Sequence, residues 1–181
     1  MKEMRLKVEM VKRIFFVLSL SAVVIFLVEC GVSENILVAE TNTGIDVGLK
    51  AATFELLTLD DKKLELESFR KDKVVLMVFS ATWCPACRHE IPLLKEYYGE
   101  FKDSGLEVLN IDIQESKKKV GSFVEKNGIN YPVVLDVTAK VASLYKVRGI
   151  PLNIILDKNG VIKYRENRPP TKDDIKRLLV N

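Results

Sequence analysis

Residues 74–79 form an unbroken apolar run, and the sequence Cys84-Pro85-Ala86-Cys87 follows it after four further residues. A run of this length and composition is typical of a central strand that is buried on both faces of a sheet. After Pro85, apolar and aromatic residues recur at three- and four-residue steps, which predicts an amphipathic helix. The sequence therefore predicts a buried strand, a short turn, and a helix whose first turn carries both cysteines.

The predicted position of the cysteine pair favours redox chemistry. The free N–H groups and the positive dipole end at a helix N-terminus stabilise a thiolate, so we expect a lowered pKa for Cys84. Pro85 suits the first helical turn because that position needs no N–H donor. Cys87 lies one turn later, close enough to form a disulfide, and we expect it to be the more sheltered cysteine. Cys84 would then attack a partner's disulfide, and Cys87 would resolve the mixed disulfide.

The cysteine pair has two alternative uses. A purely structural disulfide would close a loop of only four residues, which contributes only ~2 kcal/mol in the chain-entropy model. A zinc site could use Cys84, Cys87 and His89, but zinc normally takes four ligands and His89 is the only histidine in the chain. We therefore predict a redox-active pair that needs no metal or organic cofactor.

Two further features suit thiol–disulfide exchange. Glu90 lies three residues after Cys87 on the predicted helix, where it could take or give the proton that the exchange moves. The alternative for Glu90 is a solvated surface carboxylate. Gly149-Ile150-Pro151 directly precedes a predicted strand, and a proline at a strand start can be cis, with an ordinary trans proline as the alternative.

The rest of the chain alternates strands and helices. The sequence predicts a first strand pair around a turn at 60–63, strands at 106–113 and 132–135, and a terminal hairpin around Asp157-Lys158-Asn159-Gly160. It predicts helices that end near residue 128, around 141–145, and after Thr171, which is a favourable N-cap. This order indicates one α/β domain, from about residue 50 to 181, with a mixed sheet and helices on both faces.

Residues 1–30 have the pattern of a signal peptide or membrane anchor. Lys12 and Arg13 precede a fifteen-residue apolar run at 14–28. As a helix, the run would measure only ~22 Å, short of a hydrocarbon core of ~30 Å unless flanking residues contribute. Residues 31–49 show no sustained period and are expected to be a linker.

The sequence is compatible with three ways of processing this N-terminus. The sequence Leu27-Val28-Glu29-Cys30 resembles a bacterial lipoprotein signal, in which the cysteine becomes lipidated, although Glu29 stands where a small residue is usual. The helix could instead remain as an uncleaved anchor, or a signal could be cleaved after Ala39. In each case residues 31–181 would lie on the extracytoplasmic side of the membrane.

Charge is nearly balanced in the predicted domain. The chain has a formal net charge of +3, and residues 31–181 hold 23 basic and 22 acidic side chains. Nucleic-acid binding depends on phosphate neutralisation by basic side chains. We therefore expect no nucleic-acid partner.

Residues 50–181 resemble the thioredoxin superfamily, and in particular its TlpA/ResA-like branch of membrane-anchored extracytoplasmic thiol-disulfide oxidoreductases. The resemblance rests on Trp83-Cys84-Pro85-Ala86-Cys87, on the N-terminal hairpin, and on the turn at 157–160. It also includes a strand–helix insertion around 116–145. It implies a thioredoxin-like fold with a central mixed sheet, helices on both faces, an N-terminal hairpin and this TlpA-type insertion.

The resemblance also implies roles for single residues. Cys84 matches the nucleophile, Cys87 the resolving cysteine, and Glu90 the acidic residue that this branch keeps after the second cysteine. The expected partner-binding surface includes Trp83, which matches an aromatic residue that shields the disulfide, together with Pro85, Ile150 and Pro151. Ile150 matches the residue whose backbone pairs with the partner chain, and Pro151 matches the cis-proline.

Three positions depart from the pattern. Val78 stands where thioredoxin itself has a buried aspartate, so proton handling is expected to depend more on Glu90. Ser80 stands where the family often has tryptophan. Leu152 stands where threonine is usual, which predicts a more apolar surface for the partner.

The resemblance implies a membrane-tethered reductase of disulfides in exported proteins. Its expected substrate is apocytochrome c during cytochrome c maturation, with electrons from a membrane donor of thiol–disulfide type. A disulfide oxidant or isomerase and a non-catalytic surface-anchored binding module are the alternatives. A thiol peroxidase is disfavoured because Ala81 and Met77 occupy the positions where peroxiredoxins have threonine and proline.

Overall fold

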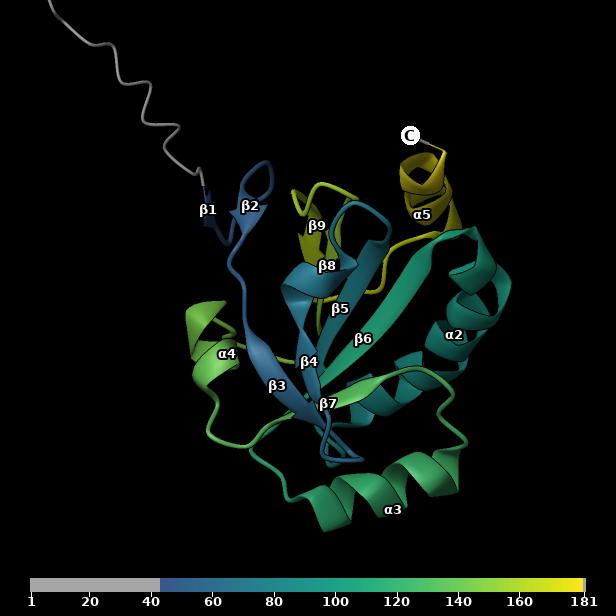
Figure 1. Ribbon diagram of the computed structural model, residues 1–181. Helices are drawn as coiled ribbons and strands as arrows, with labels where there is room; N and C mark the ends of the chain where they lie inside the picture. Colours follow the sequence, from purple (N-terminus) through teal and green to yellow (C-terminus); the bar gives the residue numbers. More distant parts are fainter. Residues whose placement is uncertain (1–42, 181) are drawn as a thin grey trace, which may run out of the picture. The chain divides into compact units, whose positions relative to one another are not determined.

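The computed structural model describes residues 43–180, and their centre is a seven-stranded mixed sheet (Figure 1). The strand order is β4-β3-β7-β6-β5-β8-β9. β5, β6 and β7 are parallel, whereas β3, β4, β8 and β9 join the sheet antiparallel to their neighbours. The strands are β3 (Glu55–Thr58), β4 (Lys63–Glu65), β5 (Val74–Ser80), β6 (Leu106–Ile113), β7 (Val133–Asp136), β8 (Leu152–Leu156) and β9 (Ile162–Glu166).

Helices cover both faces of this sheet, as the sequence predicts. On one face, Leu76 of β5 belongs to an apolar cluster with Leu94 of α2 and Ile175 of α5. On the other face, Met77 clusters with Val141 of α4. The helices are α2 (Pro85–Phe101), α3 (Lys117–Asn127), α4 (Lys140–Leu144) and α5 (Lys172–Leu179), with short 3₁₀ turns η1 (Leu66–Phe69) and η2 (Lys102–Ser104).

β5 explains why the apolar run at 74–79 is unbroken. The strand lies between β6 and β8, and all seven of its residues are buried. Successive side chains of a strand point to opposite faces, so both faces need apolar residues when helices cover both. The helix layers on the two faces therefore require this continuous run.

The expected insertion around 116–145 supplies α3, β7 and α4. β7 fills the position between β6 and the antiparallel β3, so the inserted strand links the N-terminal hairpin to the parallel centre of the sheet. Val120 of α3 packs against Val133 and Leu135 of β7. The predicted fold class is thus confirmed.

The folded domain begins earlier than the expected boundary at residue 50. Within the expected linker, β1 (Thr43–Gly44) pairs in parallel with β2 (Lys50–Ala51), and Ile45 packs against the core. The N–H of Gly48 donates to the carbonyl of Ile162 at 2.8 Å. Backbone groups make most of these contacts, so the segment has no apolar period that the sequence could show.

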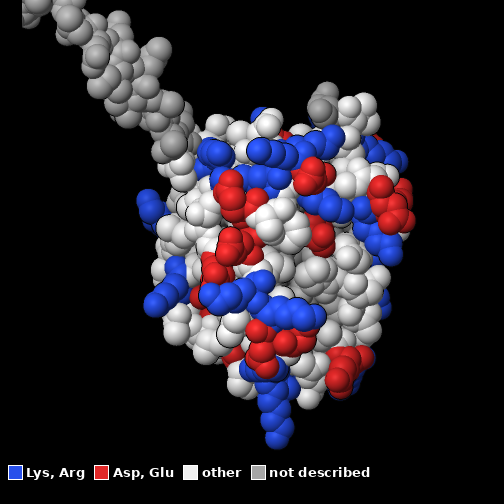
Figure 2. Space-filling view, viewed as in Figure 1, with Lys and Arg blue, Asp and Glu red and all other residues white. Residues whose placement is uncertain are grey.

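The expectations for the N-terminus concern residues outside the described part of the chain. These residues include the apolar run at 14–28, Cys30 and Ala39. Within residues 43–180, no helix combines the length and apolar character needed to cross a membrane. On the face of the domain in Figure 2, basic and acidic side chains are interspersed.

Candidate active site

The turn between β5 and α2 places Cys84 at the start of the helix. The N–H of Cys84 donates to the carbonyl of Ala81 at 3.1 Å, and Cys84 is the N-cap residue of α2. Pro85 is the first helical residue, as predicted. The N–H of Cys87 donates to Sγ of Cys84 at 3.1 Å. The sulfur of Cys84 thus receives the type of backbone donor that stabilises a thiolate.

Cys84 and Cys87 form a disulfide, with their Cα atoms 5.3 Å apart. Cys84 is 3% exposed and Cys87 is 6% exposed. The expectation that Cys87 is the more sheltered residue is therefore wrong, because the loop before β8 also covers Cys84. In that loop, the carbonyl oxygen of Ile150 lies 3.7 Å from Sγ of Cys84.

The loop before β8 holds the predicted proline next to the disulfide. The Ile150–Pro151 peptide bond is cis. The side-chain amide of Asn167 donates to the carbonyl of Gly149 at 3.2 Å and to that of Pro151 at 2.7 Å. Asn167 follows β9 and so ties together the two carbonyls on either side of Ile150. No local motif marks Asn167 in the sequence, so its role is visible only in the structure.

The surface around the buried sulfur atoms is apolar. Trp83 is 63% exposed, Pro85 and Ala86 are exposed, and Ile150 is half-buried. Most of the Trp83 side chain therefore faces solvent. These side chains give a partner protein an apolar contact area beside Cys84.

Glu90 is buried one helical turn after Cys87, at 8% exposure. The side-chain amide of Asn153 donates to its Oε2 at 3.1 Å and to its Oε1 at 3.4 Å. Burial raises the pKa of Glu90, and the hydrogen bond from Asn153 partly offsets this effect. The alternative of a solvated surface carboxylate is therefore wrong. Asn153, which the sequence analysis missed, is fully buried on β8 and pairs in register with Val78.

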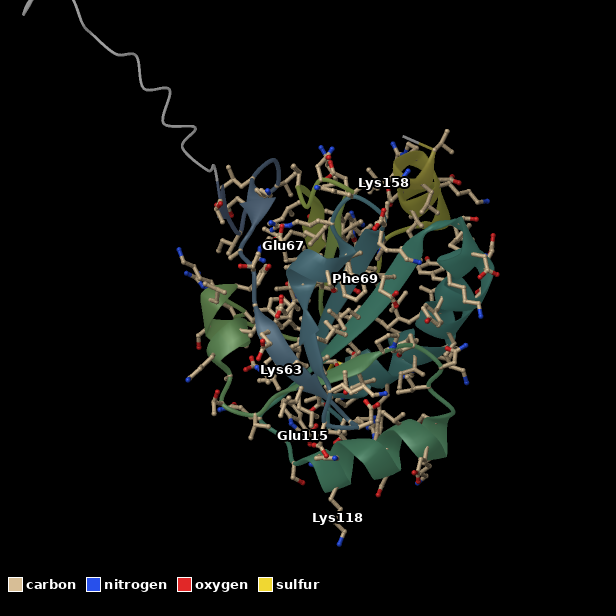
Figure 3. The ribbon with its side chains drawn as sticks, in the orientation of Figure 1. Lys63, Glu67, Phe69, Glu115, Lys118 and Lys158 are labelled. Atoms are coloured by element: carbon tan, nitrogen blue, oxygen red, sulfur yellow. A yellow bond between two sulfur atoms is a disulfide. The ribbon has the colours of Figure 1, made fainter. Side chains whose placement is uncertain are left out.

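A second carboxylate, which the sequence analysis missed, holds the turn before Cys84. Glu115 accepts hydrogen bonds from the N–H of Thr82 at 2.5 Å and from its hydroxyl at 2.8 Å. It also pairs with Lys119 at 2.5 Å. Figure 3 shows Glu115 near the N-terminal end of α3. Burial acts to raise the pKa of Glu115, but its hydrogen bonds with Lys119 and Thr82 outweigh burial and lower the pKa.

Asp112 lies at the carboxyl end of β6, opposite Ser80 of β5, and is 3% exposed. Burial and the neighbouring charge of Glu115 raise the pKa of Asp112 to about 8. The sequence held a signal for this residue, because Asn110 and Asp112 interrupt an apolar strand at alternate positions. Polar residues at the carboxyl ends of parallel strands often mark functional sites.

His89, the remaining member of the considered zinc site, is exposed on α2. Within residues 43–180, no three His, Cys, Asp or Glu side chains gather in a position to hold a metal ion. The polar groups near the disulfide are the carbonyl of Ile150, 3.7 Å from Sγ of Cys84, and Asp112, which lines the same small cavity as Cys87.

Comparisons with known proteins place this geometry in a family. The model of the AhpC/TSA family matches residues 47–165. The thiol-disulfide oxidoreductase ResA of Geobacillus kaustophilus is 35% identical over 137 residues, which cover 76% of this chain and 78% of that protein.

Solved structures show the same fold. The thioredoxin domain of a thiol-disulfide oxidoreductase from Bacteroides vulgatus matches with a TM-score of 0.65 and 27% identity, covering 74% of this chain and 95% of that one. StoA of Bacillus subtilis matches with a TM-score of 0.60 and 22% identity over 70% of this chain and 96% of that chain, which supports the fold alone. The chain therefore belongs to the AhpC/TSA family and is a ResA-like thiol-disulfide oxidoreductase of thioredoxin-like fold.

Proposed function

We propose that this protein reduces disulfide bonds in exported proteins through Cys84 and Cys87, and that apocytochrome c is among its substrates. The observation that carries the proposal is the disulfide at the N-terminus of α2, which faces the carbonyl of Ile150. A helix N-terminus favours the thiolate form of Cys84, and the adjacent backbone carbonyl can receive an N–H from a partner chain.

In the proposed reaction, the thiolate of Cys84 attacks one sulfur of the substrate disulfide. A mixed disulfide forms, and the second substrate sulfur leaves as a thiolate that takes a proton from water. Cys87 then loses its proton and attacks Sγ of Cys84. This breaks the mixed disulfide and releases, as a thiolate, the substrate sulfur that was bound to Cys84. The substrate gains two electrons and the Cys84–Cys87 pair becomes a disulfide.

Substrate recognition follows from the surface around the sulfur atoms. The apolar side chains of Trp83 and Pro85 would contact the partner, while Ile150 would pair with its backbone. Pro151 fixes the path of the loop beside Cys84. Glu90, with its raised pKa, would exchange a proton with the thiol groups during the reaction.

The proposed location is the extracytoplasmic face of the cell membrane. The basic residues before the apolar run at 14–28 support an anchor with this orientation. The anchor would be the N-terminal helix itself or a lipid on Cys30. A membrane-bound dithiol protein would return the Cys84–Cys87 pair to its reduced form.

The first test is the reduction potential of the Cys84–Cys87 pair in the full-length chain, by equilibration with thiol buffers. A potential near that of thioredoxin, about −270 mV, is expected for a reductase. A potential near about −120 mV would instead indicate an oxidant of exported proteins.

A trapping experiment tests the residue roles and the substrate. Cys87→Ser should accumulate a mixed disulfide with apocytochrome c, because the resolving thiol is missing. Cys84→Ser is the matched control and should form no such species. Trapping by Cys84→Ser in place of Cys87→Ser would reverse the assigned roles.

A further inference from the structure

A small cavity lies next to Cys87, on the side of the sheet that α2 and α3 cover. Its volume is about 20 Å³, which is room for one water molecule. Glu90 is absent from its lining, although Glu90 is the acid that the sequence analysis assigned to proton transfer. The polar or titratable residues that line the cavity are Ser80, Thr82, Cys87, Arg88, Asn110, Asp112 and Tyr131.

Asp112 is the only carboxyl group among these lining residues. Its Oδ1 atom is buried and has no hydrogen-bond partner within the described part of the chain. A buried acceptor without a partner is unfavourable, because it loses its hydrogen bonds to water on folding. A water molecule in the cavity would satisfy this oxygen and could also reach Cys87.

The charged groups around Asp112 determine its protonation state. Glu115, in the loop after β6, disfavours the charged form of Asp112, and burial acts in the same direction. Lys119 of α3 acts in the opposite direction, but Glu115 holds its ammonium group at 2.5 Å. Arg88 of α2 and Tyr131, before β7, line the same cavity. A side-chain hydrogen bond with Glu115 also favours the neutral form, and together these effects raise the pKa of Asp112 to about 8.

We propose that Asp112 exchanges a proton with Cys87 through one water molecule in this cavity. The proposal rests on the roles given to Cys84 and Cys87 above. When the thiolate of a reducing protein attacks Sγ of Cys84, the S–S bond breaks and Cys87 leaves with the electron pair. The water gives Cys87 a proton and receives one from Asp112, and the reducing thiolate enters a mixed disulfide. In the opposite direction, Cys87 returns the proton as it attacks Cys84.

The test follows reduction of the oxidised full-length chain by dithiothreitol across the pH range from about 6 to about 9. Trp83 is the only tryptophan in the chain and precedes Cys84, so its fluorescence can report the loss of the disulfide. Each rate is divided by the concentration of the reductant's thiolate. The test variant is Asp112→Asn, which keeps the shape of the side chain.

Glu107→Gln is the matched control. Glu107 lies on the same strand, β6, and burial raises its pKa, but it does not line the cavity. The corrected rate of the wild type and of Glu107→Gln should be constant at low pH and fall above about pH 8, where Asp112 loses its proton. The rate of Asp112→Asn at neutral pH should be lower by at least about tenfold and show no fall near pH 8.

Two results would overturn the inference. One is a folded Asp112→Asn protein whose corrected rate and pH profile equal those of the wild type. The other is an equal decrease of the rate in Glu107→Gln, which would indicate a general charge effect. If dithiothreitol reduces the wild-type disulfide at no pH in this range, the proposed function is contradicted instead. The two failures are therefore distinguishable in one experiment.

Discussion

The pairing of Glu90 with Asn153 leads to a quantitative prediction for Asn153→Leu. This substitution keeps the number of side-chain heavy atoms and the branch at Cγ but removes the amide that donates to both carboxylate oxygens of Glu90. A hydrogen bond to a charged group contributes about 1.5–3 kcal/mol. Since one pKa unit corresponds to about 1.4 kcal/mol, the pKa of Glu90 should rise by about one to two units. The direction follows because burial remains while the group that stabilises the anion is lost.

The shift can be measured by a carbon-13 NMR titration of the glutamate side-chain carboxyls, with Glu90→Gln to assign the signal. Asn110→Leu is the control, because Asn110 is another buried amide, on β6, without a hydrogen bond to Glu90. An unchanged or lower pKa of Glu90 in Asn153→Leu would refute the reasoning. Equal shifts in both variants would show that the effect comes from general repacking.

Three further predictions concern other parts of the domain. Asn167→Ala should slow exchange with protein disulfides by about tenfold, since two backbone contacts beside Cys84 are lost, but leave reduction by dithiothreitol unchanged in rate assays. The folded-state pKa of Asp112 lies above its ordinary value of 3.8. The folded state therefore binds the extra proton, and urea unfolding should show stability falling from about pH 4 to about pH 8, with a smaller slope in Asp112→Asn. Thr171→Ala removes the capping box with Asp174 and should cost about 1 kcal/mol in the same unfolding assay.

Local patterns were sufficient to predict the elements that surround the disulfide. The apolar run of β5 and the period of α2 are properties of adjacent residues, and so are the turn at 157–160 and the cap at Thr171. The segment at 43–49 resembles a linker in sequence, whereas in the structure it makes backbone hydrogen bonds and a short strand pair. Such contacts do not depend on side-chain type and leave no pattern in the sequence.

The polar partners in the site could not be predicted in the same way. Asn153 and Glu90 are 63 positions apart in the chain and form a hydrogen bond, and so do Glu115 and Thr82, which are 33 positions apart. The register of β5 with β6 and β8 brings these residues into contact, and a single sequence does not specify that register. The cysteines and Pro151, in contrast, lie in short motifs whose chemistry depends on residues next to them in the chain.

Val78 gives the two buried acids of the site separate surroundings. It pairs in register with Asn153 on one side and Asn110 on the other, so an apolar side chain occupies the centre of the sheet between two amides. Asn153 donates to Glu90, whereas Asp112 lies two residues beyond Asn110, next to Glu115. The two buried acids therefore differ in their hydrogen-bond partners, with Asn153 for Glu90 and Glu115 for Asp112.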